Sequence, residues 1–112
     1  MVRHNAAVAE SLAQVENEVV LRIDTLRKFC TELQSAEVHD DGVFLRLFRR
    51  VQELLELSDQ QISDSLRVSR PTVNRWMNGR NLPHPLMRIP IAKWAVEQVI
   101  RRLKVLEKCA GR

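Results

Sequence analysis

Residues 58–79 have the sequence SDQQISDSLRVSRPTVNRWMNG, and this stretch decides the fold because it holds two helix starts and two helix stops. At the first start, the hydroxyl of Ser58 can accept a hydrogen bond from a free amide, and Gln61 three residues later completes a capping box. Apolar residues four positions apart then give the segment one apolar stripe. The pattern predicts a short helix over residues 59–66.

A second helix start follows after only three residues. Ser69 can cap it, and Pro71 falls in its first turn, where the missing amide hydrogen removes no hydrogen bond. Asn78 and Gly79 form a helix stop. The pattern therefore predicts a second helix over residues 70–78 and, with the tight turn before it, a helix-turn-helix.

The second helix has an apolar and a polar face. If Val73 and Trp76 point inward, the side chains that point outward include arginine and asparagine, which read guanine and adenine through paired hydrogen bonds in the major groove. An ordinary amphipathic helix with a solvated polar side would share this pattern. The caps, the turn length and the outward chemistry agree, however, and together they favour DNA recognition.

This stretch resembles the helix-turn-helix of the Cro/lambda-repressor (XRE-type) family over about residues 43–90. The matching segments are VSRPTVNRW at 68–76, NGR at 78–80 and LP at 82–83. The resemblance implies that the base-facing positions are Arg70, Pro71, Thr72, Asn74 and Arg75. It also implies that the phosphate-contacting positions are Ser58, Asp59, Gln60, Ser69, Arg80 and Asn81.

The chain departs from the family pattern at two positions and has an unusual charge at a third. Arg67 stands in place of the turn glycine, where a left-handed conformation would cost about 1 kcal/mol. Met77 replaces an acidic residue. Asp59 carries the same sign of charge as a phosphate, so Gln60 is the better donor at that end of the helix.

Length and composition indicate a single domain, or a small domain with a helical appendage, in a chain of 112 residues. Apolar residues make up 45% and aromatic residues 4%, which predicts an aliphatic core. No apolar run approaches the ~20 residues of a membrane span. The N-terminus has no apolar signal segment, so we expect no membrane partner and a location in the bacterial cytosol or nucleoid.

The net charge of +4 is distributed unevenly. Residues 1–57 hold seven Arg or Lys and ten Asp or Glu, a net charge of −3, whereas residues 58–112 hold eleven and four, a net charge of +7. A basic half suggests a polyanionic partner. A membrane surface would also attract that charge, but a helix-turn-helix inside the basic half favours double-stranded DNA.

The sequence contains no catalytic or cofactor motif. It has no glycine-rich phosphate loop, and Cys30 and Cys109 have no neighbours at metal-ligand spacing, so we interpret them as free thiols. The run His39-Asp40-Asp41 is adjacent in sequence and would not converge on one metal. We expect a non-enzymatic protein without a cofactor.

The N-terminal segment predicts one long helix, about residues 6–38, after a frayed start. Its heptad-like apolar positions are Val8, Leu12, Val15, Val19, Leu26, Phe29 and Leu33. In one interpretation the helix folds back onto the domain and enlarges its core. In the other, which its length favours, the residues from Leu12 to Leu33 pair with a second chain, and a dimer would double the number of base pairs read.

Two further helices complete the prediction. The first covers residues 43–57 and packs behind the helix-turn-helix, with arginines that we interpret as solvated surface. A stiff loop over residues 80–85 then leads to a last helix over residues 91–108, in which Trp94 belongs to the core.

The sequence therefore predicts an all-α fold with residues 1–42 as an oligomerisation helix and linker and residues 43–112 as the DNA-binding domain. We expect a bacterial or phage transcription regulator that acts as a homodimer or higher oligomer and that can contact RNA polymerase or another protein. The alternative is an antitoxin or adaptor whose N-terminal helix binds a partner protein. Single-stranded RNA binding is disfavoured because no exposed aromatic platform is expected.

Overall fold

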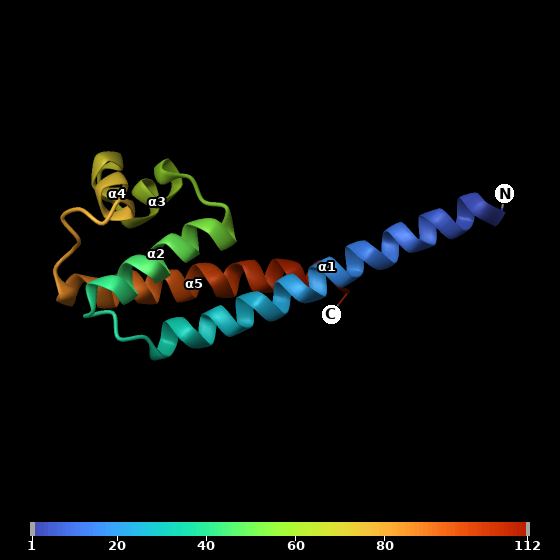
Figure 1. Ribbon diagram of the computed structural model, residues 1–112, viewed down its shortest axis with the longest axis horizontal. Coiled ribbons are helices and arrows are strands. Elements are labelled where there is room, and N and C mark those ends of the chain that lie inside the picture. Colours follow the sequence, from blue (N-terminus) through green and yellow to red (C-terminus); the bar gives the residue numbers. More distant parts are fainter. Residues whose placement is uncertain (1, 112) are drawn as a thin grey trace.

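Every regular element in the described part of the chain is an α-helix, which confirms the all-α prediction (Figure 1). The computed structural model describes the backbone of residues 2–111 and the side chains of residues 12–111. The helices are α1 (Val2–Ser35), α2 (Asp41–Leu55), α3 (Asp59–Leu66), α4 (Arg70–Met77) and α5 (Pro85–Cys109). Among the residues that the structure describes, no helix contains an apolar run of the length that a membrane span requires.

The helices form three layers (Figure 1). The long helices α1 and α5 lie side by side in opposite directions, α2 lies against them, and α3 and α4 lie beyond α2. One core cluster joins α1, α2 and α5; its buried residues are Leu26, Phe29, Leu33, Leu47, Val51, Leu55, Ala95 and Val99. A second joins α2 to α3, α4 and the start of α5; its buried residues are Val38, Phe44, Phe48, Ile62, Val73, Trp76, Met77 and Ile91. The two faces of α2 thus connect the long helices to the helix-turn-helix.

The first of these clusters corrects the interface predicted for α1. Leu26, Phe29 and Leu33 are at most 5% exposed, and they are buried against α2 and α5 of the same chain. These three side chains are core residues, because α5 already covers the face that a second chain would need. The core also runs across the predicted boundary at residue 42. Of the other predicted positions, Leu12 and Val15 are exposed and Val19 is half-buried beside the end of α5, and the side chain of Val8 lies outside the described residues.

The ends of α1 and α2 differ from the predicted ones by two to four residues. α1 begins at Val2, whereas the sequence predicted fraying up to residue 5, and it ends at Ser35 because Val38 turns into the core. α2 begins at Asp41, where the carboxylate of Asp40 accepts a 2.9 Å hydrogen bond from the amide of Val43. The cap was hidden in a polar run that the sequence assigned to a linker.

The start of α5 is also wrong in the prediction, which placed it at Ile91. His84 caps the helix, since its Nδ1 accepts a 3.1 Å hydrogen bond from the amide of Leu86, and Pro85 occupies the first position. Pro90 lies inside the helix and cannot donate to the carbonyl of Leu86. Leu86 is 68% exposed, so the carbonyl that loses this donor belongs to a residue on the solvent side of the helix.

A buried arginine joins α5 to the connection between α1 and α2. The guanidinium of Arg88, 3% exposed, donates to the carbonyls of Pro83 (2.8 Å), Val38 (3.2 Å) and His39 (2.9 Å). It also donates to the carboxylate of Asp41 at 2.7 Å, and it lies 5.2 Å from the centre of the Phe44 ring. Arg88 therefore satisfies three backbone carbonyls from two separate parts of the chain.

Replacing Arg67 by glycine is expected to stabilise the protein by about 0.5–1 kcal/mol, because only glycine adopts the left-handed conformation without steric cost. Arg67 has φ 57° and ψ 42°, and it ends α3 as the sequence predicted. The free energy of unfolding in urea measures the gain. Arg67→Ala is the matched control: it removes the same charge, keeps the Cβ atom, and should bring no such gain. Equal stabilities for the two variants would contradict the predicted strain.

Candidate nucleic-acid interface

Helices α3 and α4 form the predicted helix-turn-helix, separated by residues 67–69. Ser58 accepts a 3.1 Å hydrogen bond from the amide of Gln61, whose side chain accepts a 2.8 Å hydrogen bond from the amide of Ser58. This is the predicted capping box. Ser69 caps α4 by accepting from the amide of Thr72 at 3.2 Å, with proline in the first turn. Both helix starts lie where the sequence placed them.

The turn between the two helices is stabilised by two hydrogen bonds between Ser63 and Val68. Ser63 is 6% exposed, and its hydroxyl donates to the carbonyl of Val68 at 2.6 Å. In return, the amide of Val68 donates to the carbonyl of Ser63 at 3.1 Å. These two hydrogen bonds close the chain after α3 and fix the direction in which α4 leaves the turn.

The apolar face of α4 points into the protein, as predicted. Val73 is fully buried, Trp76 is 8% exposed and Met77 is 9% exposed. The indole of Trp76 packs edge-on against Phe48 of α2, with ring centres 5.8 Å apart. Ile62 of α3 belongs to the same cluster. This packing fixes the rotation of α4 about its axis and hence the side chains that it turns outward.

The five predicted base-contacting residues lie on the other face of α4. Arg70, Pro71, Asn74 and Arg75 are exposed, and Thr72 is half-buried. The Thr72 hydroxyl lies 2.7 Å from that of Ser69 and accepts a 3.3 Å hydrogen bond from Nη2 of Arg75. A polar row therefore runs along the outer face, in which the Thr72 hydroxyl links Ser69 to Arg75.

The segment that contains α4 and its flanking turns carries charge of one sign. Residues 67–81 contain four arginines and no acidic residue. Within the described part of the chain, the guanidinium groups of Arg70, Arg75 and Arg80 form no ion pair with a carboxylate, whereas Arg46 and Arg50 of α2 do. Cations without local counter-charges favour a polyanion at this face.

At the start of α3, the backbone amides of the predicted phosphate-contacting residues are better suited to bind phosphate than their side chains are. The capping box uses the amides of Ser58 and Gln61, which leaves those of Asp59 and Gln60 at the open end of the helix. The carboxylate of Asp59 accepts a 2.6 Å hydrogen bond from Gln52 of α2, so this side chain positions α3 and is no phosphate donor. The amide group of Gln60 donates to Asp64 at 2.8 Å.

Of the other three predicted phosphate contacts, Ser69 caps α4, and Arg80 and Asn81 are exposed in the loop after α4. Gly79 has φ 73°, and an added Cβ atom would lie 3.2 Å from the Leu45 side chain, so this position suits glycine. The amide of Arg80 donates to the carbonyl of Arg75 at 2.7 Å. The loop therefore holds Arg80 directly beside the end of the recognition face.

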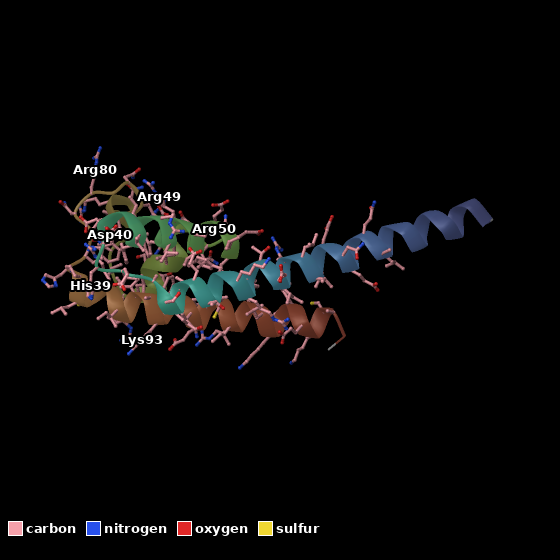
Figure 2. The ribbon with its side chains drawn as sticks, turned by 60° about the horizontal axis from the view of Figure 1, so that its bottom comes forward. His39, Asp40, Arg49, Arg50, Arg80 and Lys93 are labelled. Atoms are coloured by element: carbon pink, nitrogen blue, oxygen red, sulfur yellow. The ribbon has the colours of Figure 1, made fainter. Side chains whose placement is uncertain are left out.

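Three side chains that support the site were not predicted. Arg49 of α2 donates through Nε to the carbonyl of Met77 at 2.7 Å and closes the end of α4, and Gln52 holds Asp59. Trp94 of α5 donates to the hydroxyl of Ser65 on α3 at 2.7 Å. Figure 2 shows Arg49 on the same side of the molecule as Arg80 and Lys93 on the opposite side. The periodicity of the sequence marked Arg49 as surface and Trp94 as core, and it gave no prediction for Gln52.

Comparison of the chain with protein-family models, with curated protein sequences and with solved structures gave no match. Among the described residues, no three His, Cys, Asp or Glu side chains gather as a metal ion would require. Asp40 and Asp41 of the His-Asp-Asp run instead cap α2 and pair with Arg88.

Proposed function

We propose that the protein binds double-stranded DNA in a sequence-specific manner, with α4 in the major groove, and acts as a transcription regulator of the helix-turn-helix type. The observation that carries the proposal is the orientation of α4. Trp76 and Val73 are buried, while Arg70, Asn74 and Arg75 are exposed, and the two arginines form no ion pair with a described carboxylate.

Recognition would take place in two layers. The open amides of Asp59 and Gln60, together with Ser69, Arg80 and Asn81, are suited to grip phosphates and to set the register of the protein on the duplex. Arg70 and Arg75 then read guanine, and Asn74 reads adenine, through paired hydrogen bonds. Pro71 and Thr72 offer apolar contact to thymine methyl groups.

The rigidity of the motif supports this function. The Ser63–Val68 hydrogen bonds fix the turn, and the contacts of Arg49 and Trp76 fix the end and the rotation of α4. A recognition helix that is already ordered loses little conformational entropy on binding, so more of the contact energy contributes to affinity.

Selection of bound sequences from a random duplex pool tests the proposal. We expect an enriched motif that contains guanine and adenine at positions that one recognition helix can reach, and tighter binding to it than to scrambled DNA at a fixed salt concentration. Enrichment of no sequence at all would contradict sequence-specific recognition. A control selection with Trp76→Ala, which removes the packing behind α4, should lose the motif.

Arg80→Gln is expected to weaken binding to the selected site and to random DNA by the same factor, because a phosphate contact carries no sequence information. The slope of log K against log salt concentration should become shallower by about 1, as expected for one lost phosphate contact. Binding titrations over a salt series measure both effects. A loss confined to the selected site would instead make Arg80 a base-contacting residue.

A further inference from the structure

Helix α2 contacts both ends of the proposed DNA-binding surface. Gln52 donates to Asp59 at the start of α3 at 2.6 Å, and Arg49 donates through Nε to the last carbonyl of α4 at 2.7 Å. Residues three positions apart lie on one face of a helix, so the two side chains leave α2 on the same side. Arg49 therefore lies beside the end of α4 and about one helical turn from the residue that holds the start of α3. Proposed phosphate contacts are found at both places.

Arg49 differs from the other two arginines of α2 in its partners. Arg46 pairs with Glu32 of α1 at 2.7 Å, and Arg50 pairs with Glu53 at 3.6 Å. Among the side chains that the structure describes, Arg49 has no carboxylate partner, and its hydrogen bond to α4 uses Nε alone. Because an arginine has five N–H donors, the four on Nη1 and Nη2 remain for a ligand.

The hydrogen bond through Nε also fixes the direction of the Nη groups. The guanidinium is planar, so holding Nε against the carbonyl of Met77 restricts the plane in which both Nη groups lie. The side chain of Arg49 is exposed, and Figure 2 shows it on the same side of the molecule as Arg80. A long side chain that is already held in place loses less rotamer entropy when it binds a ligand.

Arg49 also changes the electrostatics at the end of α4. The last carbonyls of a helix carry a partial negative charge, which repels an anion. Arg49 binds one of these carbonyls, that of Met77, and brings a full positive charge to the same place. Arg80 follows Met77 by three residues and adds a second exposed positive charge. The end of α4 is therefore suited to lie next to an anion.

We propose that Arg49 contacts a phosphate of the bound duplex through its Nη groups, while Nε keeps its hydrogen bond to Met77. The inference rests on the proposed function and deepens it, because it extends the phosphate-contacting surface from the helix-turn-helix onto α2. A backbone phosphate fits this position better than a base edge, because Arg49 lies beside the end of α4 and not on its outer face. One guanidinium thus positions the recognition helix and holds the DNA backbone next to it.

Arg49→Gln tests this contact in the full-length protein. The side-chain nitrogen of glutamine is as many bonds from the backbone as Nε of arginine, so the variant keeps a donor for Met77 and loses the Nη groups and the charge. We expect weaker binding to the selected duplex and to a random duplex by the same factor. The slope of log K against log salt concentration should become shallower by about 1. Fluorescence anisotropy titrations over a salt series measure both effects.

Two further variants assign the effect to this one contact. Arg49→Lys keeps the positive charge and should bind both duplexes with a salt slope close to that of the wild type. Arg50→Gln is the matched control, because it removes the same charge from the next residue of α2, whose guanidinium is paired with Glu53. It should leave the slope unchanged. Circular dichroism and urea denaturation check that all three variants fold like the wild type.

The outcomes separate this inference from the proposed function. A wild-type protein that binds neither duplex would overturn both. If the wild type binds DNA and Arg49→Gln keeps its salt slope, the inference alone is wrong. A loss confined to the selected duplex at an unchanged slope would make Arg49 only a positioning residue for α4. An equally shallow slope for Arg50→Gln would attribute the effect to net charge, and it too would contradict a contact at Arg49.

Discussion

Arg75→Ala is expected to weaken binding to the selected DNA site by about 1–3 kcal/mol, or roughly 5- to 150-fold, and to change binding to random DNA far less. Arg75 lies in the middle of the exposed face of α4, opposite the buried Val73, so its guanidinium can reach a base edge. Fluorescence anisotropy titrations with both duplexes at one salt concentration measure the difference.

A lysine at the same position separates charge from base recognition. Arg75→Lys keeps the positive charge but loses the planar fork that makes two hydrogen bonds to guanine. It should bind random DNA like the wild type and bind the selected site nearly as weakly as Arg75→Ala. If the alanine variant loses the same factor on both duplexes, Arg75 contacts phosphate and α4 does not read bases through it.

Arg88→Met is expected to lower the free energy of unfolding by about 3–5 kcal/mol, because it leaves buried polar groups without a partner. The carbonyls of Val38, His39 and Pro83 all lose their donor, and methionine fills the volume of the side chain without replacing a hydrogen bond. Urea denaturation followed by circular dichroism measures the loss.

Two controls assign that loss to the carbonyls. Asp41→Asn removes the charged partner of Arg88, but the Asp41 side chain is 76% exposed, so its ion pair should contribute no more than about 1 kcal/mol. Arg101→Met changes an exposed arginine on the same helix and should stay within about 0.5 kcal/mol of the wild type. A similarly small loss for Arg88→Met would show that the three hydrogen bonds contribute little.

The helix-turn-helix was predictable because its signals are local. Ser58 and Ser69 each start a helix by bonding an amide three residues away, and those bonds form in the predicted places. The inward position of Trp76 follows from helical periodicity with Val73. Interactions between residues three or four positions apart require particular residue types at a fixed spacing, so they can be predicted from the sequence.

Interactions between distant segments left no such signal. Arg88 binds carbonyls about 50 residues earlier, yet in the sequence it is one arginine among apolar residues. The heptad pattern of α1 predicted an apolar face, but the same face would suit α5 or a second chain. The start of α5 was missed because prolines usually mark helix ends, while here Pro85 takes the first position and His84 supplies the cap. DNA binding by α4 stays a prediction.

The tryptophans make one part of the molecule visible to spectroscopy. The chain has no tyrosine and two tryptophans: Trp76 is buried behind α4, and Trp94 donates its indole hydrogen to Ser65 of α3. Intrinsic emission therefore reports on the motif that carries the recognition helix, whereas far-ultraviolet dichroism is dominated by the two long helices. Coincident melting curves from the two signals would mean that the helix-turn-helix and the long helices α1 and α5 unfold as one cooperative unit.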